Sequence, residues 1–382
     1  TPIVAKASGA MSHPTELEQW QAEVSTRMPH LSKPQATVLA LYSFGIVLTQ
    51  RCGLTTVVGC LSLLLGQPPG RLRQRLREWN YAGGDKRGAQ RRTLEVGHSF
   101  GPLLRWLLAD WSASKQLTLV LDVTYLREQF AVLAISVVYR GCAIPVAWRV
   151  LAGNAQGDWH PLWVELLGYL TPVVPARWQV YVLTDRGLYS KRLFEVIRAA
   201  RWHPLMRIRQ QGKWRRPRAK TWQALRRLAH PSMGVWCQRV VCFKTDPLVC
   251  TLVASWDARY QEPCLLVTDL APNRVEPNHY ALRAWIEAGF KDLKRGGLRW
   301  EQTKITDPQR ADRLWLVIAV ALLWLIRVGG PVQALWLAQD PHTLALSCLS
   351  AGWLALLTAL LRQQPLPHGS FIPLDRPSPY GN

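Results

Sequence analysis

The fold is decided by the stretch Leu117–Leu151, LTLVLDVTYLREQFAVLAISVVYRGCAIPVAWRVL. It contains three apolar runs, LTLVLDVT, FAVLAISVVY and CAIPVAWRVL, separated by short polar segments. Runs of β-branched and aliphatic residues of this length are typical of strands buried on both faces. The pair Arg140-Gly141 marks a tight turn between the second and third runs. We therefore expect three successive strands joined by short turns.

The following segments extend this pattern. WHPLWVELLGYL predicts a helix, WQVYVLTD a fourth strand, SKRLFEVIRAA a helix and HPLMRIR a fifth strand. This order is that of a ribonuclease H-like sheet, in which the first and fourth strands lie side by side. That adjacency would bring together Asp122 and Asp185, which are 63 residues apart in the chain.

Each of these aspartates ends an apolar run, in LTLVLDVTY and in VYVLTDRGLY. In open α/β sheets, active sites gather at the carboxyl ends of strands. The alternative is that either aspartate only caps a turn or a helix. A third carboxylate, Glu287, lies in the segment HYALRAWIEAGFKDLKRG. Three such carboxylates in a chain with only 25 acidic residues supply the acidic triad that two-metal phosphoryl transfer requires.

Glu287 belongs to a stripe with Tyr280, Arg283 and Lys294. At about 100° per residue, one continuous helix would place all four side chains within about 60°. A carboxylate can hold a divalent metal, and the Tyr, Arg and Lys groups can bind a nucleic-acid backbone around it. We count Lys291 among these DNA-binding groups. The alternative interpretation is a solvated, charged helix face.

The sequence here resembles the DDE transposases of bacterial insertion sequences, and within them the group named after insertion sequence four. That group carries Tyr, two residues, Arg, three residues, Glu, six residues and Lys, which the stripe from Tyr280 to Lys294 matches without a gap. LDVTYL, TDRGLYS and CLLVTDL resemble the flanking blocks, and the resemblance covers roughly residues 117 to 328.

The resemblance implies that Asp122, Asp185 and Glu287 are catalytic and bind two Mg²⁺ ions about 4 Å apart, for which Mn²⁺ can substitute. It implies that Tyr280, Arg283 and Lys294 hold the DNA near the cut. The implied activity is cleavage at terminal inverted repeats and joining of the 3′ ends to target DNA by a homodimer in a synaptic complex. The alternatives are a ribonuclease H-like nuclease or resolvase, and a domesticated DNA-binding protein without catalysis.

Composition supports a polyanionic partner independently. Lys plus Arg number 47 against 25 acidic residues, a formal charge of +22, which favours double-stranded DNA, here transposon ends and target DNA. We expect no membrane partner, because no basic amphipathic anchor is present. The longest apolar run, Leu314–Ile326, has 13 residues, short of the roughly 20 that span a bilayer. It predicts a buried core helix.

The sequence thus predicts an α/β protein with a ribonuclease H-like catalytic core and a β-rich insertion, preceded by an all-helical N-terminal DNA-binding domain. The expected divisions are 1–13, a vector scar and disordered start; 14–115, the helical domain; 116–209 and 272–330, the core; 210–271, the insertion; and 331–382, C-terminal helices and a proline-rich tail. Apolar helices are expected from Ala311 to Val328 and from Ala334 to Leu361, covering the sheet and supporting a dimer.

Further DNA contacts are expected outside the core. After the break QPPG, the run RLRQRLREW carries Arg71 and Arg75, and GGDKRGAQRR reads as a basic loop. In the insertion, Trp214 and Trp222 are interleaved with basic residues, a pattern that can stack an unpaired base. Core packing is the alternative for any insertion tryptophan. The resemblance implies that one of them handles a flipped base.

The eight cysteines predict no zinc site, because Cys237, Cys242, Cys250 and Cys264 lack paired metal-ligand spacing. We expect reduced, structural thiols. Residues before Met11 are interpreted as vector-derived and show no signal peptide. The expected location is the bacterial cytoplasm, associated with the nucleoid.

Overall fold

The computed structural model describes residues 15–87, 92–111, 115–231, 233–257, 259–294, 296–339 and 346–372. The predicted vector scar, the centre of the basic loop and the last ten residues of the proline-rich tail lie outside these ranges.

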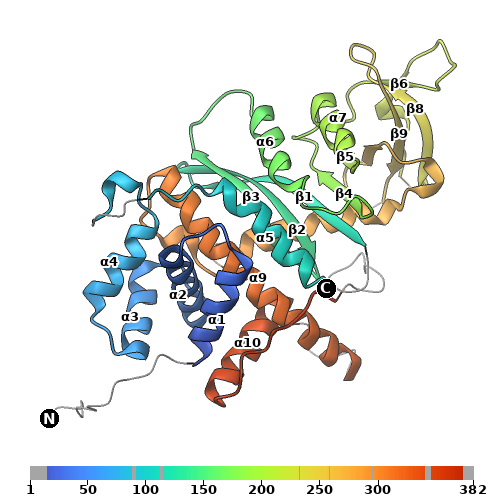
Figure 1. Cartoon of the computed structure of the whole chain (residues 1–382). Helices are drawn as coiled ribbons and strands as arrows, with labels where there is room; N and C mark the ends of the chain where they lie inside the picture. Colours follow the sequence, from blue (N-terminus) through green and yellow to red (C-terminus); the bar gives the residue numbers. More distant parts are fainter. Residues whose placement is uncertain are drawn as a thin grey trace.

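The centre of the molecule is one large mixed sheet (Figure 1). Its ten strands run in the order β3-β2-β1-β4-β5-β10-β9-β8-β6-β7. The strands are β1 Gln116–Leu126, β2 Phe130–Tyr139, β3 Cys142–Ala152, β4 Gln179–Thr184, β5 His203–Arg207, β6 Lys213–Arg215, β7 Gln223–Ala224, β8 Trp236–Cys242, β9 Leu248–Ser255 and β10 Cys264–Thr268. β1, β4 and β5 are parallel, and the other pairs are antiparallel.

The predicted strands up to residue 207 are confirmed, as is the pairing of the first strand with the fourth. The turn between β2 and β3 forms because Arg140 and Gly141 have φ of 46° and 80°. Two successive positive φ values match the right-handed twist of a two-residue hairpin. This turn fixes the register of β2 against β3.

The insertion does not form a sheet of its own. β10 pairs with β5 on one side and with β9 on the other, so β6 to β9 continue the core sheet. The expected insertion, residues 210–271, contains β6 to β10, and β10 supplies the edge that joins its strands to the core sheet. The insertion strands therefore have a fixed position relative to β4 and β5.

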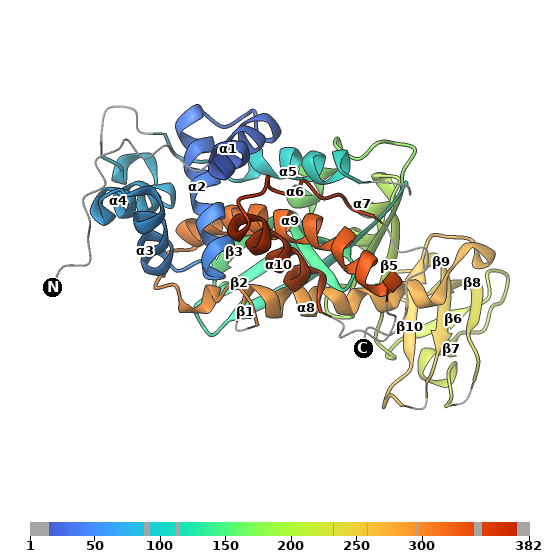
Figure 2. The same ribbon diagram turned by 90° about the horizontal axis from the view of Figure 1, so that it is seen from below.

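Helices surround the sheet and form the N-terminal part of the chain (Figure 2). They are α1 Thr15–Arg27, α2 Lys33–Thr49, α3 Leu54–Leu65, α4 Pro69–Trp79, α5 Gly97–Ala109, α6 His160–Leu170, α7 Lys191–Ala199, α8 Ala284–Leu293, α9 Pro308–Gln339 and α10 Cys348–Leu361. α3 ends at Gly66, which has φ 60°, and α4 begins at Pro69. Trp20 of α1 stacks on Trp324 of α9 at 3.9 Å, so the N-terminal helices share the core of the rest.

α9 corrects the prediction of two helices separated near residue 330, since it runs unbroken through Pro331. A proline inside a helix leaves the carbonyl four residues earlier without its donor. Here the carbonyl of Arg327 accepts a hydrogen bond from Ser370 N at 3.1 Å. Gly329 lets α10 pack closely, because a Cβ there would lie 1.8 Å from Cys348 O. The C-terminal segment therefore stabilises an otherwise weakened helix.

α9 is also long and apolar enough to cross a membrane by length and composition. Within the protein, however, 89% of its most apolar window is buried. This confirms the predicted core helix.

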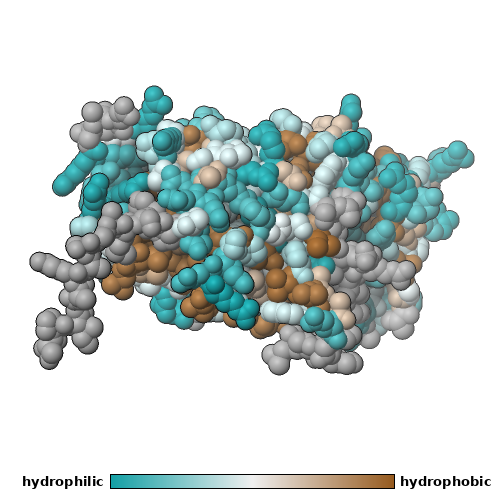
Figure 3. Space-filling view, turned by 60° about the horizontal axis from the view of Figure 1, so that its bottom comes forward, coloured by the Kyte–Doolittle hydropathy of each residue, from teal (hydrophilic) through white to brown (hydrophobic). Residues whose placement is uncertain are grey.

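On the face shown in Figure 3, hydrophilic side chains predominate and hydrophobic areas form separate patches.

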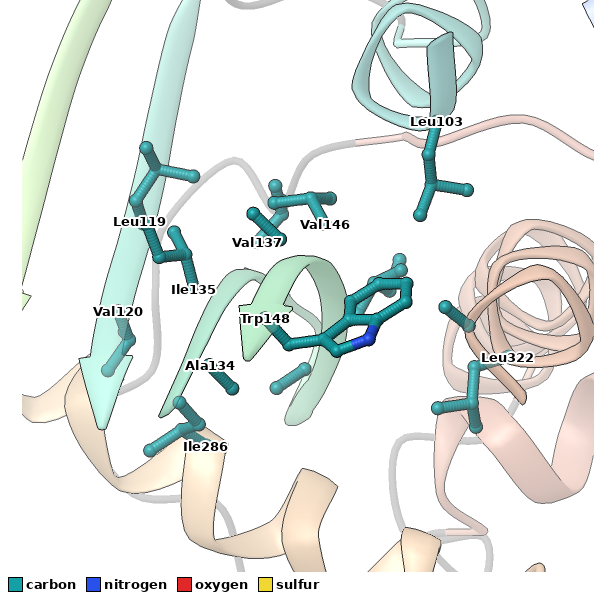
Figure 4. Packing of buried hydrophobic residues seen from close by; sticks show 14 of the residues in the cluster. Leu103, Leu119, Val120, Ala134, Ile135, Val137, Val146, Trp148, Ile286 and Leu322 are labelled. Atoms are coloured by element: carbon teal, nitrogen blue, oxygen red, sulfur yellow. The ribbon is translucent and has the colours of Figure 1, made fainter. Parts of the chain in front are cut away.

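The core between the sheet and the helices positions α8. Figure 4 shows Ile286 of α8 lying toward β1 and β2, with Leu103 of α5 and Leu322 of α9 around the ring of Trp148. Ile286 is fully buried. A Cβ at Gly289 would lie 2.7 Å from the Cβ of Ala143 on β3. α8 is therefore held tightly against the sheet, which fixes the direction of its neighbouring residue Glu287.

Asp312 provides a test of how α9 packs against β3. Its Oδ1 accepts a hydrogen bond from Val150 N at 3.2 Å, and burial raises its pKa to about 7, with Arg149 opposing the shift. The folded protein then holds a proton that the unfolded chain releases near its ordinary pKa. The contribution of Asp312 to stability is therefore full at low pH and is lost as pH rises through the window from about 4 to about 7.

We predict that the free energy of unfolding of Asp312→Asn rises relative to wild type across this window, by up to about 4 kcal/mol. Denaturant unfolding of both proteins at several pH values measures the difference. Glu195→Gln, at an exposed ion pair, is the control and should follow wild type. Parallel pH profiles for wild type and Asp312→Asn would contradict the prediction.

Candidate active site

Asp122 and Asp185 lie side by side because β1 and β4 are parallel neighbours. The register pairs Leu121 of β1 with Thr184 of β4, and each of these residues is followed by an aspartate. The two aspartates therefore lie next to each other across the strand pair. The predicted adjacency is confirmed. As expected, Asp122 lies near the carboxyl end of its strand, and β1 continues past the expected end at Thr124 to Leu126. β2 goes on pairing with β1 after β4 has ended, and Asp122 itself faces Ala134.

Glu287 comes from α8, and the residues around it correct the prediction of one continuous helix. Tyr280 and Arg283 lie in a 3₁₀ helix, Pro277–Arg283, before α8 begins at Ala284. A 3₁₀ helix turns by about 120° per residue, so the 100° stripe does not apply. Lys294 follows the end of α8, with φ −98° and ψ −138°.

The end of α8 has a clear physical cause. The chain turns back so that Leu298 N donates to Asp292 O at 2.7 Å, and Gly297 passes so close that a Cβ would lie 2.1 Å from the same oxygen. Glycine is the residue that tolerates this approach. The turn directs Lys294 toward β1.

The three carboxylates converge on the guanidinium of Arg283. Its Nη2 lies 2.9 Å from Asp122 Oδ2 and 3.9 Å from Asp185 Oδ2, and its Nη1 pairs with Glu287 Oε1. The side chains of Arg283 and Asp122 are each 17% exposed. Within the described ranges no three His, Cys, Asp or Glu side chains are close enough together to hold a metal ion. In this cluster the guanidinium of Arg283 lies between the carboxylates.

The electrostatics of this cluster favour a bound cation. Burial raises the pKa of Asp122, and the charge of Arg283 opposes that rise. Burial alone would lower the pKa of Arg283, but Asp122 and its neighbours raise it overall. The Nε of Arg283 is buried and has no hydrogen-bond partner among the described residues. The hydrogen bonds and ion pairs of Arg283 within the cluster are therefore made by its two Nη atoms.

Tyr280 and Lys294 connect the glutamate helix to both aspartate strands. The Tyr280 hydroxyl donates to Thr184 O at 3.0 Å, and burial raises the pKa of this phenol. Lys294 Nζ donates to Thr124 Oγ1 at 2.7 Å and to Tyr125 O at 2.8 Å. In this structure both side chains position the site, whereas the sequence suggested only a role in holding DNA.

An open cavity of about 820 Å³ adjoins the cluster, and Glu287, Arg283 and Tyr280 line it. Its wall includes residues that the sequence analysis missed: Arg186, Arg207, Arg259, Tyr260 and Glu262. Arg186 Nη1 pairs with Glu262 at 2.7 Å. Arg186 directly follows Asp185 in TDRG, and that position was the available signal. The insertion thus contributes one wall of the candidate site.

The remaining predicted DNA-binding residues lie elsewhere. Lys291 is exposed in the last turn of α8, one helical turn after Glu287, whereas Arg71 and Arg75 are exposed on α4. Trp214 does not suit a DNA contact: it is 5% exposed and packs against Trp236 with ring centroids 5.2 Å apart. β6 and β8 are too short to bury their shared face without it.

Trp222 is half-buried, and the guanidinium of Arg215 lies 5.2 Å from its ring centroid. The eight cysteines are all free thiols, as predicted.

Comparison with known proteins finds a family model that matches part of the chain. Residues 150–324 match the family model described as transposase DDE domain. The match includes Asp185, Arg283 and Glu287, whereas Asp122 precedes it. This match supports a DDE transposase. No curated protein matches the chain. Among solved structures, the chain is similar to the piggyBac transposase in its synaptic complex with hairpin DNA, with a TM-score of 0.42, 11% identity, and coverage of 93% of this chain and 79% of that one.

Proposed function

We propose that this protein is a DNA transposase of the insertion-sequence-four group. It binds terminal inverted repeats, cuts the DNA at the element ends and joins the 3′ ends to target DNA. The observation that carries the proposal is the convergence of Asp122, Asp185 and Glu287 on one cation beside an open cavity. The transposase DDE match and the formal charge of +22 support it.

The donor set suits a hard divalent cation. Carboxylate oxygens are the ligands that Mg²⁺ and Mn²⁺ prefer, and the same three carboxylates already hold a guanidinium. Asp122, Asp185 and Glu287 would hold two such ions. When bound, they would activate water or a 3′-hydroxyl and stabilise the leaving oxygen. No covalent intermediate with the protein is needed.

The basic groups of the site would hold the substrate. Arg283 lines the cavity, and a guanidinium binds phosphate strongly because its donors are charged. Tyr280 and Lys294 fix the helix that carries Glu287 relative to both aspartates. Correct placement of reacting groups contributes much of the rate in phosphoryl transfer.

We further propose a homodimer in a synaptic complex, associated with the bacterial nucleoid. Leu335 near the end of α9 is 57% exposed and Leu361 at the end of α10 is 76% exposed. Both leucines belong to the C-terminal helices that we expected to support a dimer.

The alternative function is a nuclease or resolvase, which cuts without joining. The test uses a plasmid that carries the gene with its natural flanking DNA, a second target plasmid and Mg²⁺. We expect paired breaks at inverted repeats and covalent joining of the 3′ ends to the target. Cleavage without joined products would favour the alternative.

We predict that Arg283→Ala and Lys294→Ala reduce cleavage of bound DNA more than they reduce affinity. Many other basic groups share the phosphate contacts, whereas these two position the cut strand and the glutamate helix. Gel-shift affinity and single-turnover cleavage of saturated complexes separate the effects. Arg192→Ala, at an exposed ion pair, is the control. Lost affinity with normal cleavage of the remaining complex would reverse the assignment.

A further inference from the structure

A second cavity lies between α3, α4 and residues 299–310, which form the end of the α8–α9 connection and the start of α9. Its volume is about 450 Å³. Six cationic side chains line it: Arg51, Arg73, Arg77, Arg299, Lys304 and Arg310. Arg73 and Arg77 project from the side of α4 roughly opposite to the predicted Arg71 and Arg75, because two residues along a helix turn by about 200°.

Most of these charges lack a carboxylate partner. Arg310 pairs with Asp85 at 3.4 Å, and Asp307 accepts the backbone N–H of Arg310. The other five cations form no ion pair with any carboxylate in the part of the chain that the structure describes. Arg73 donates instead to Thr55 Oγ1 at 3.1 Å, a neutral oxygen. Five like charges facing one cavity repel each other, and a bound polyanion would relieve that repulsion.

The cavity is connected to the candidate active site by a short segment. Arg299 N donates to Lys294 O at 3.1 Å, and Cys52 N donates to Leu298 O at 2.9 Å. The same turn that directs Lys294 toward β1 therefore directs Arg299 into the cavity. Figure 2 shows α8 lying lengthwise along the sheet between the insertion and the α3–α4 end. A ligand that leaves the carboxylates along α8 reaches this cavity.

The backbone of Arg299 is unusual. It has φ 56° and ψ 44°, the left-handed region that favours glycine and that other residues adopt at a cost. The turn itself needs only a residue with positive φ. Arginine at this position retains a charge inside the cavity at the expense of local strain.

We propose that this cavity binds the phosphodiester backbone of the DNA duplex beside the cut, without reading its sequence. The proposal rests on the proposed function. An extended backbone fits because the cations come from the loop between α2 and α3, from α4, from the segment after α8 and from α9. The ring of Tyr81 could stack an unpaired base, but two arginines already lie beside it. The guanidinium carbons of Arg310 and Arg77 are 4.4 and 5.7 Å from its ring centroid. Contact with phosphates of a paired duplex is therefore favoured over contact with unpaired bases.

The test is the salt dependence of binding to a random-sequence duplex, measured by fluorescence anisotropy without divalent metal. Each phosphate contact contributes about 0.9 to the slope of log K against log salt concentration. For Arg73→Ala/Arg299→Asn/Lys304→Ala we expect the slope to fall by about 2.7. Asparagine is chosen at 299 because it tolerates the left-handed region.

The control is Arg192→Ala/Arg198→Ala/Arg201→Asn. It removes the same charge, and Arg201 also has a positive φ of 62°, but Arg192 and Arg198 are already paired with carboxylates. Its slope should equal that of wild type. Thermal unfolding checks that each variant is folded. If the triple variant of the cavity is unfolded, its three single substitutions replace it, and each should lower the slope by about 0.9.

A wild-type slope in the triple variant, or an equal loss in the control, would overturn the cavity proposal alone. Failure of the wild-type protein to bind duplex DNA would overturn the proposed function as well. Arg73→Lys preserves the charge and should keep the wild-type slope. A reduced slope for Arg73→Lys would contradict the proposal, because the slope would then not report the charge of this side chain.

Discussion

Asp122→Asn, Asp185→Asn and Glu287→Gln are each expected to reduce Mg²⁺-dependent DNA cleavage by about a thousandfold or more. A metal ion contributes several kcal/mol to the stabilisation of transition-state charge, and about 1.4 kcal/mol is worth a factor of ten. The amides keep the size of each side chain and remove the charge that attracts the ions. DNA affinity should persist, because it depends on the Lys and Arg groups.

Cleavage rates and gel-shift affinities, measured on the same DNA, test this expectation. Glu262→Gln is a matched control, since Glu262 lines the same cavity and pairs with Arg186 without joining the cluster on Arg283. It should keep cleavage near the wild-type rate. A variant of Asp122, Asp185 or Glu287 that cleaves within about tenfold of wild type would remove that residue from the catalytic set.

Arg327→Ala is expected to lower the free energy of unfolding by about 3–5 kcal/mol. The Arg327 side chain is 2% exposed and pairs with Glu23 and with Asp110, the latter at 2.8 Å. Its removal leaves Glu23, whose side chain is 19% exposed, without its partner, while Asp110 keeps Arg27 at 2.8 Å. An uncompensated buried charge is costly because it cannot recover the solvation that it lost on folding.

Denaturant unfolding measures the effect. Arg198→Ala removes an exposed ion pair whose side chains are 47% and 45% exposed, and it should change stability by less than about 1 kcal/mol. Adding Glu23→Gln to Arg327→Ala should restore part of the loss, because the unpaired charge disappears. Equal stability of Arg327→Ala and the control would show that the ion cluster does not hold α9 against α1.

Sequence patterns predicted much of the sheet. The apolar runs from Leu117 to Arg207 gave the strands and helices, because each run is bounded by polar or turn-forming residues. The parallel pairing of β1 with β4 followed from their order, and it placed Asp122 beside Asp185. Local chemistry was sufficient for these features.

Features that depend on tertiary contacts were not predictable in this way. Nothing in the periodicity of the segment indicates the change from a 3₁₀ helix to α8 at Ala284, or that Arg283 contacts Asp122 and Asp185 from two distant strands. We expected one helix to end at Val328 and another to begin at Ala334, but α9 runs through Pro331, and Ser370 supplies the missing donor. Trp214 lies among arginines in sequence and yet faces Trp236 in the structure. In each case a residue far along the chain decides the outcome.

The most direct test of the central claim is calorimetric titration of Mn²⁺ into the protein bound to duplex DNA, for wild type and for Asp122→Asn/Glu287→Gln. If the carboxylates from β1, β4 and α8 form the divalent metal site, wild type should bind Mn²⁺ saturably and the double variant should lose that binding while keeping its DNA. Binding of Mn²⁺ by the double variant with the stoichiometry and affinity of wild type would contradict the account.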